Sequence, residues 1–254
     1  MRIISKSKWF KFNNSVDGSA KIAELFIYGE ITSYKWCDSD VTANEFKNDL
    51  ESFGDIDQLD IFINSPGGSV FQGQAILSMI NRFKEKNNIK VRMVVDGVAA
   101  SAASFLLMAG DTIEMPENAL LMIHNAWTYT AGNSEELRKA ADDLEKINQS
   151  IINAYMKKAK VSEDKIKELM DAETWLNASD AKEIFDIEII DEKDIAASIR
   201  DFEKSLNLYK NTPKFTFVKE GDKQDKVLDD NNEKEEVEKA IKKFEVISIL
   251  NREW

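Results

Sequence analysis

The fold is decided by residues 91–107, Val-Arg-Met-Val-Val-Asp-Gly-Val-Ala-Ala-Ser-Ala-Ala-Ser-Phe-Leu-Leu. The apolar, β-branched start of this stretch predicts a strand over 91–95, and the residues that follow predict a helix over 102–108. A serine at a helix N-terminus lies among unpaired N–H donors, at the positive end of the helix dipole, where a developing oxyanion is stabilised. Ser101 is therefore a candidate nucleophile, although a serine that only caps a helix beside close-packed alanines has the same local sequence.

Strands and helices alternate on both sides of this stretch. Runs rich in β-branched and aromatic residues predict strands, and apolar residues at helical spacing predict helices. This order is typical of an α/β fold. The predicted strands are 22–31, 59–64, 91–95, 112–115 and 120–123, and the predicted helices are 41–53, 70–83, 102–108 and 134–158.

The longest predicted helix, 134–158, has charged residues on one side and apolar residues on the other. A helix with this pattern needs a surface on which to bury its apolar side. The apolar residues are Leu137, Leu144, Ile147, Ile151 and Tyr155.

The character of the chain changes after residue 200. Residues 220–233 are too charged and too poor in apolar groups to form a core, so we expect a linker there. A short amphipathic helix is expected beyond it, because apolar residues return at helical spacing. We therefore expect one globular domain over 1–200 and an acidic linker with a short C-terminal helix over 201–254. The apolar residues of that helix are Val237, Ile241, Phe244 and Ile247.

Charge and composition exclude several classes of function. The net charge of −12 disfavours nucleic-acid binding, which depends on clustered Lys and Arg. Cys37 is the single cysteine and cannot form an internal disulfide, so a reducing compartment is expected. We find neither a signal peptide nor the ~20 apolar residues of a membrane-spanning helix. The sequence therefore predicts a cytoplasmic protein without membrane or nucleic-acid partners.

A glycine pair follows the predicted strand 59–64, within residues 64–69, Asn-Ser-Pro-Gly-Gly-Ser. Two glycines let the backbone turn sharply and bring bare N–H groups close to a substrate, as an oxyanion hole requires. The same residues also suit an ordinary turn between a strand and a helix.

His124 is the only histidine in the chain and directly follows the predicted strand 120–123. Histidine is the usual base for activating a serine, because its pKa lies near neutrality. A lone histidine at a strand end is also common as a structural residue. The order Gly-Gly, serine, histidine and acid along one chain favours nucleophilic catalysis, for which we expect neither a metal nor a cofactor.

Three stretches resemble the signature segments of the ClpP peptidase family, namely 63–68, 97–110 and 122–124. Tyr155 and residues 175–181 are similar to later segments of that family, so the resemblance covers about 20–192. It implies a ClpP/crotonase-like spiral of repeated β-β-α units. In this family a long protruding "handle" helix, here 134–158, joins stacked homo-oligomeric rings into a closed chamber.

The resemblance assigns roles to individual residues. Ser101 would be the nucleophile and His124 the general base, while Gly68 and Ala102 would donate backbone N–H groups to the oxyanion. The family usually has Asp at the third position of the triad, where this chain has Glu173.

Glu173 lies two residues before the aromatic Trp175. A glutamate can also orient an imidazole and stabilise the imidazolium. Asp171 is the alternative acid.

The implied activity is that of a serine endopeptidase acting on peptide or protein substrates. The wording Glu-Thr-Trp at 173–175 and the acidic tail are most similar to the ClpP-like prohead proteases of tailed phages and prophages, which process capsid or scaffold proteins. For such a protein the location would be the host cytoplasm or the prohead.

Three alternatives stay open. One is a general degradative ClpP subunit assisted by an ATPase. The chain has no Gly-x-x-x-x-Gly-Lys-Ser/Thr loop, so an unfoldase would have to be a partner, and the unfamiliar N-terminal region leaves that docking uncertain. The others are an acyl-CoA hydratase or isomerase, because the crotonase family shares the spiral fold, and a non-catalytic shell component.

Overall fold

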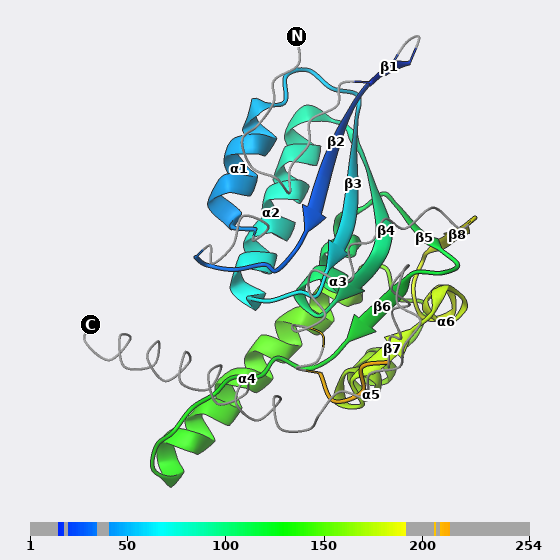
Figure 1. The fold of residues 1–254 in the computed structure, drawn as a ribbon. Coiled ribbons are helices and arrows are strands. Elements are labelled where there is room, and N and C mark those ends of the chain that lie inside the picture. The colour runs from blue at the N-terminus through cyan, green and yellow to red at the C-terminus, as the bar shows by residue number, and fades with distance from the viewer. Residues whose placement is uncertain (1–14, 18–19, 35–40, 192–205, 207–208, 214–254) are drawn as a thin grey trace, which may run out of the picture. The chain divides into compact units, whose positions relative to one another are not determined.

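The computed structural model describes residues 15–17, 20–34, 41–191, 206 and 209–213 (Figure 1). The chain forms two compact units, Met1–Ala126 with Ala141–Pro213, and Trp127–Ala140 with Lys214–Trp254. The first unit contains the sheet and every predicted site residue.

Each strand and helix predicted within residues 22–158 has a counterpart in the structure, and the described residues form further elements at 15–17, 163–171, 174–176, 178–184 and 188–190 that the sequence did not predict. The strands are β1 (Ser15–Asp17), β2 (Ala20–Tyr28), β3 (Gln58–Ser65), β4 (Lys90–Ala100), β5 (Thr112–Pro116), β6 (Leu120–Ile123), β7 (Thr174–Leu176) and β8 (Glu188–Ile190). The helices are α1 (Ala43–Ser52), α2 (Val70–Asn87), α3 (Ala102–Leu106), α4 (Ser134–Tyr155), α5 (Glu163–Asp171) and α6 (Ala178–Ile184), with a 3-10 turn η1 (Leu107–Ala109) after α3.

The main sheet has the order β1-β2-β3-β4-β5-β8, and its strands are parallel from β2 onward. Strand β4 has two partners on one side, β5 along residues 92–94 and β6 along residues 98–100. Strand β6 in turn pairs with β7 in antiparallel fashion. The predominantly parallel sheet confirms the expected α/β class. The turn after Ala100 lies where the two parts of the sheet separate.

The core lies between the sheet and the helices that cover it. Helices α1 and α2 pack against each other and cover one face of β2, β3 and β4 (Figure 1). Each fully buried aliphatic side chain adds about 1.5–3 kcal/mol of hydrophobic stabilisation. Completely buried side chains from these elements include Leu25, Ile27, Ile61, Ile63, Val91, Met93, Phe46, Ile76 and Ile80.

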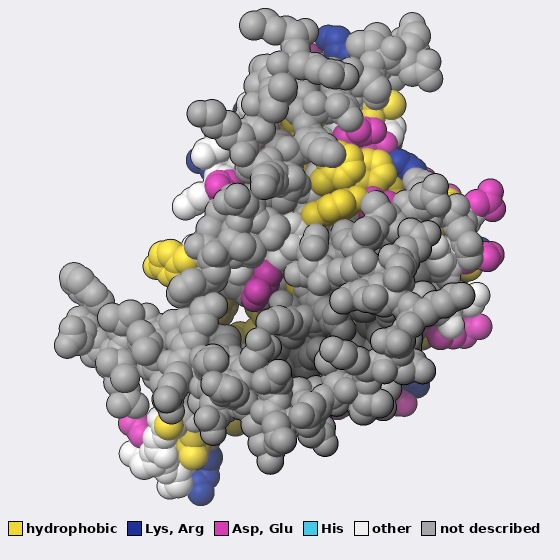
Figure 2. All heavy atoms as spheres, viewed as in Figure 1, with side chains coloured by type: hydrophobic (Ala, Val, Ile, Leu, Met, Phe, Trp, Pro, Cys, Tyr) yellow, Lys and Arg dark blue, Asp and Glu magenta, His cyan; other side chains and the backbone are white. Residues whose placement is uncertain are grey.

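Hydrophobic side chains on strands β2 to β4 also gather on an outer surface, with acidic and basic side chains beside them (Figure 2). The rings of Phe26 and Phe62 stack with their centroids 4.9 Å apart. Arg92 lies 6.0 Å from the centroid of the Phe62 ring and forms ion pairs with Asp60 and Glu114. The long arginine side chain thus covers part of an aromatic surface while its charge is neutralised.

The structure describes one of the two amphipathic helices that the sequence predicts after residue 130. The long amphipathic helix is present as α4, with Ile151 and Tyr155 buried and Leu137 44% exposed. The linker at 220–233 and the helix expected beyond it lie outside the described residues. Within the described part of the chain, no helix has the length and hydropathy needed to cross a membrane.

Candidate active site

Ser101 lies at the turn between β4 and α3, in a backbone conformation that is rare for a residue with a side chain. Its φ and ψ are 53° and −123°, and such strain persists only where neighbouring bonds fix the backbone. The Ser101 N–H donates to the carbonyl of Met122 on β6 at 3.0 Å, which ties the turn to that strand.

The carbonyl of Ser101 is fixed by Ser104, one turn further along α3. It accepts hydrogen bonds from the Ser104 N–H at 3.0 Å and from the Ser104 hydroxyl at 2.7 Å. The Ser104 Oγ is also 2.6 Å from the hydroxyl of Tyr155, at the end of α4. Burial raises the pKa of Tyr155, so the phenol stays neutral and keeps its proton for this bond.

Gly67 packs directly against the serine turn. Its φ is 93°, and an added Cβ would lie 2.5 Å from the carbonyl oxygen of Ala100 and 2.7 Å from the Cβ of Ser101. The Ser65 hydroxyl accepts the Gly67 N–H at 3.1 Å. The Pro-Gly-Gly loop can therefore approach Ser101 only because this position has no side chain.

Gly68 and Ala102 present the two N–H groups predicted for an oxyanion hole. Gly68 pairs with Ile31 in a short parallel bridge, but the bonds of that bridge use the carbonyl of Gly67 and the N–H of Ser69. Ala102 is the first residue of α3, where a helix has no internal acceptor for the N–H. Within the described part of the chain, neither N–H has an acceptor, so both remain available to a substrate oxygen.

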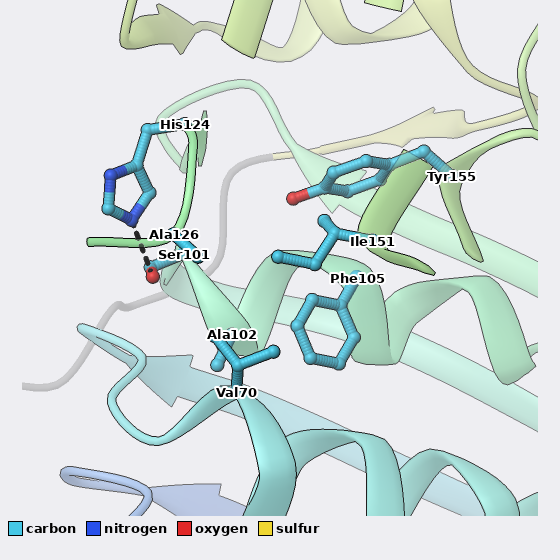
Figure 3. A pocket seen from close by; sticks show the side chains of 8 residues that line it. All are labelled: Val70, Ser101, Ala102, Phe105, His124, Ala126, Ile151 and Tyr155. Atoms are coloured by element: carbon cyan, nitrogen blue, oxygen red, sulfur yellow. Dashed lines mark hydrogen bonds between the residues drawn. The ribbon is translucent and has the colours of Figure 1, made fainter. Parts of the chain in front are cut away.

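His124 meets Ser101 from the end of β6. Its Nε2 is 2.7 Å from the Ser101 Oγ, and the side chain is 9% exposed (Figure 3). Burial lowers the pKa of His124 to about 4, while the negative charge of Glu173 opposes this shift. The imidazole is therefore neutral at pH 7, which is the form that can accept a proton from a serine.

The two predicted acids have different surroundings. Glu173, between α5 and β7, is close enough to His124 to influence its pKa, although no hydrogen bond joins the two side chains in the described residues. One carboxylate oxygen, Oε1, accepts the N–H of Asn211 at 2.6 Å. Asp171 is exposed and accepts a hydrogen bond from the Asn125 amide at 2.7 Å. The charge interaction with His124 therefore favours Glu173 over Asp171 as its partner.

A small pocket adjoins Ser101 and His124 on one side (Figure 3). The chain beyond His124 is held in place because the Ala126 N–H donates to the Asn148 side chain on α4 at 2.7 Å. Most of the residues that line the pocket are apolar. Its lining consists of Val70, Ser101, Ala102, Phe105, His124, Ala126, Ile151 and Tyr155.

Tyr209 and Asn211 have no role predicted from the sequence, yet both contact the site. The Tyr209 ring meets the His124 ring edge-on, with centroids 5.0 Å apart. Burial raises the pKa of Tyr209, while a hydrogen bond with Ser101 acts in the opposite direction. The charge pattern of this region gave no indication of such packing, and the only local signal is the apolar character of Leu206 and Tyr209.

Comparison with known proteins identifies the family to which the chain belongs. Residues 21–192 match the family described as Clp protease. The chain is also similar to a protein of Pleurastrum terricola named "ATP-dependent Clp protease proteolytic subunit", with 33% identity over 136 residues, which cover 52% of this chain and 67% of the relative.

A predominantly parallel α/β fold, in which a serine at a strand-to-helix turn is in hydrogen-bond contact with a histidine at the end of another strand, is typical of a serine hydrolase. Because residues 21–192 match the Clp protease family, the class of the protein is a serine peptidase. The chain belongs to the Clp protease family.

Proposed function

We propose that this protein is a serine endopeptidase in which Ser101, His124 and Glu173 form the catalytic triad. The observation that carries the proposal is the distance of 2.7 Å between the Ser101 Oγ and the Nε2 of a neutral, nearly buried His124. A neutral imidazole in contact with a hydroxyl is the arrangement that nucleophilic acyl transfer requires.

In this mechanism the Ser101 Oγ attacks the scissile carbonyl as its proton passes to the His124 Nε2. The resulting oxyanion accepts hydrogen bonds from the N–H groups of Gly68 and Ala102. His124 then gives the proton to the leaving amine, and the C–N bond breaks. Water, deprotonated by His124, hydrolyses the acyl-enzyme and returns Ser101 to its hydroxyl form.

Steady-state hydrolysis of a fluorogenic peptide with an apolar residue at the acyl position tests the mechanism. We expect Ser101→Ala to lower kcat by roughly 10⁴- to 10⁶-fold, as nucleophile removal does in serine proteases. Ser179→Ala is a matched control, because Ser179 is an exposed serine on α6. Equal rates for the parent protein and Ser101→Ala would reject Ser101 as nucleophile.

We further propose a phage or prophage setting, in which a homo-oligomeric ring of this protein processes capsid or scaffold proteins in the host cytoplasm or in the prohead. The support is the Glu-Thr-Trp sequence at 173–175 and the acidic tail. A tail that tethers the protease inside an assembling shell would be required for incorporation but not for peptide hydrolysis.

Deleting residues 214–254 is the appropriate test of tethering, because Tyr209–Pro213 packs on the peptidase unit. We expect unchanged peptide hydrolysis and loss of incorporation into proheads. Unchanged incorporation would reject tethering. Dependence of protein degradation on an added unfoldase ATPase would instead favour a general degradative Clp subunit.

A crotonase-type acyl-CoA enzyme is the second candidate, because an oxyanion hole at the end of a spiral fold serves both classes. Enzymes of that class generally move protons with carboxylates, whereas the group touching Ser101 here is an imidazole. Saturable binding of an acyl-CoA, measured by calorimetry, would favour that candidate; we expect none.

A further inference from the structure

The segment that includes Tyr209 and Asn211 lies beyond the residues that match the Clp family, and it forms its own compact turn. The hydroxyl of Thr212 donates to the carbonyl of Leu206 at 2.6 Å and lies 3.2 Å from the carbonyl of Tyr209. The side chain of Leu206 is 1% exposed and anchors the start of the turn. The described residues of this turn, Leu206 and Tyr209–Pro213, are called the C-terminal turn here.

Tyr209 connects the two halves of the site. Its hydroxyl donates to the carbonyl of Pro66 at 2.6 Å, directly before the glycine pair of the proposed oxyanion hole. Its ring also packs on the ring of His124, the proposed base for Ser101. One side chain therefore fixes the loop that presents Gly68 and excludes water from His124.

Asn211 holds the loop of the proposed triad acid. Its N–H donates to Glu173 Oε1 at 2.6 Å, and its side-chain amide donates to the carbonyls of Ala172 at 2.8 Å and Glu173 at 3.2 Å. Glu173 has a φ of 47°, a left-handed conformation that is unfavourable for a residue with a side chain. The three bonds from one residue therefore hold both the strained backbone and the carboxylate.

A segment that simply blocked the site would fill the pocket beside Ser101. None of the residues that line that pocket comes from the C-terminal turn. Apart from the contact between Tyr209 and Ser101, the hydrogen bonds that its residues make with other described residues go to Pro66, Ala172, Glu173 and the turn itself. These are groups that support the site, so the contacts favour positioning over inhibition.

We propose that Tyr209 and Asn211 are positioning residues of the active site, Tyr209 for His124 and the oxyanion loop, and Asn211 for Glu173. This inference rests on the proposed peptidase function. It makes the C-terminal turn a required part of the catalytic unit, so the unit extends to residue 213 and includes about twenty residues more than the family match.

Kinetics of the full-length protein test the proposal with variants Tyr209→Ala, Tyr209→Phe and Asn211→Ala. Displacing a catalytic group by about 1 Å costs roughly 10²-fold in rate, so we expect Tyr209→Ala and Asn211→Ala to lower kcat by about that factor with little change in KM. Tyr209→Phe keeps the ring and should retain most of the activity of the parent protein. Lys210→Ala is the matched control, because Lys210 is exposed within the same turn.

A pH profile separates positioning from a general loss of structure. Among the residues that the structure describes, Tyr209 and Glu173 are the titratable groups that interact with His124. Removing the Tyr209 ring admits water, so the acid limb of kcat/KM in Tyr209→Ala should rise from about pH 4 toward the ordinary histidine range near 6.5. The limb of Tyr209→Phe should stay in place. Thermal unfolding of each variant shows whether the fold is intact.

Three results would overturn the inference. Unchanged kcat and pH profile in both alanine variants would show that the turn has no role in positioning. A higher kcat would show that it is an inhibitory cover. If the parent protein and Ser101→Ala hydrolyse peptide equally slowly, the proposed function itself fails, and the positioning role fails with it.

Discussion

His124 is almost fully buried, and its ionisation determines the pH range in which Ser101 can be activated. Burial lowers its pKa to about 4, and Glu173 limits the shift. Only the neutral imidazole can take the serine proton, so activity is lost as the pH falls through this value. We predict that kcat/KM stays level from neutral pH down to an acid limb near pH 4. A limb near 6.5, with the fold intact by circular dichroism, would contradict the assignment.

Glu173 is the residue at which this chain departs from the usual aspartate. In Glu173→Gln the charge that favours the imidazolium is absent, so the pKa of His124 and the acid limb should move to still lower pH. The kcat should fall by about 10²- to 10⁴-fold, because the amide no longer stabilises the imidazolium. Asp171→Asn is the control and should retain activity, since Asp171 contacts Asn125. The reverse ranking of the two variants would make Asp171 the triad acid.

At the scale of elements, the active site depends on how closely the Pro-Gly-Gly loop approaches the turn between β4 and α3. Gly67→Ala would place a methyl group 2.5 Å from the carbonyl of Ala100, at a φ of 93°. We expect a loss of about 1–3 kcal/mol in the free energy of unfolding and a clear loss of activity, because the methyl group displaces Ser101. In the control Gly54→Ala, the added Cβ has no neighbour within 4 Å. Equal activity of the two variants would contradict this account.

A hydrogen bond between the hydroxyls of Ser104 and Tyr155 joins α3 to α4. Ser104→Ala leaves the fully buried hydroxyl of Tyr155 without its partner, which costs about 1–3 kcal/mol. Removing both hydroxyls in Ser104→Ala with Tyr155→Phe should recover part of that loss. A double-mutant cycle of unfolding free energies measures the coupling. Strictly additive losses would show that the bond does not link the two helices.

Local sequence predicted some of these elements well and others poorly. The strand at 120–123 is present with the same bounds, because its apolar run ends at a polar residue. The strand predicted at 91–95 extends to Ala100, since the Asn64 side chain accepts the Val98 N–H at a shift in register between β3 and β4. The helix predicted at 102–108 divides into α3 and η1. Such irregular backbone depends on contacts between distant residues, which periodicity does not report.

At the scale of the whole molecule, the order of the motifs along the chain predicted only some of the residues that meet at the active site. Ser101, His124 and the glycine pair follow elements whose ends meet at one edge of a parallel sheet, so their convergence could be expected. The contacts of Tyr209 and Asn211 could not, because they depend on a segment that returns to the site from about 35 residues beyond β7. The left-handed Glu173 was also not predictable from its neighbours.

The proposed ring gives a prediction about α4. Leu137 is 44% exposed on the apolar side of this helix, and burying a leucine at an interface contributes about 1.5–3 kcal/mol. We expect Leu137→Glu to lower the assembly mass seen by native mass spectrometry. Asn153→Glu adds the same charge at an exposed position of α4 and should leave the mass unchanged. An unaltered mass in Leu137→Glu would exclude this side of α4 from the interface.

The central claim is that Ser101 is a nucleophile activated by His124. Mass spectrometry after treatment with a fluorophosphonate tests it directly, because the reagent phosphonylates an activated serine. We predict a single adduct on Ser101 that is absent in Ser101→Ala and forms far more slowly in His124→Ala. An adduct on a different residue, or no adduct on the folded parent protein, would contradict the account.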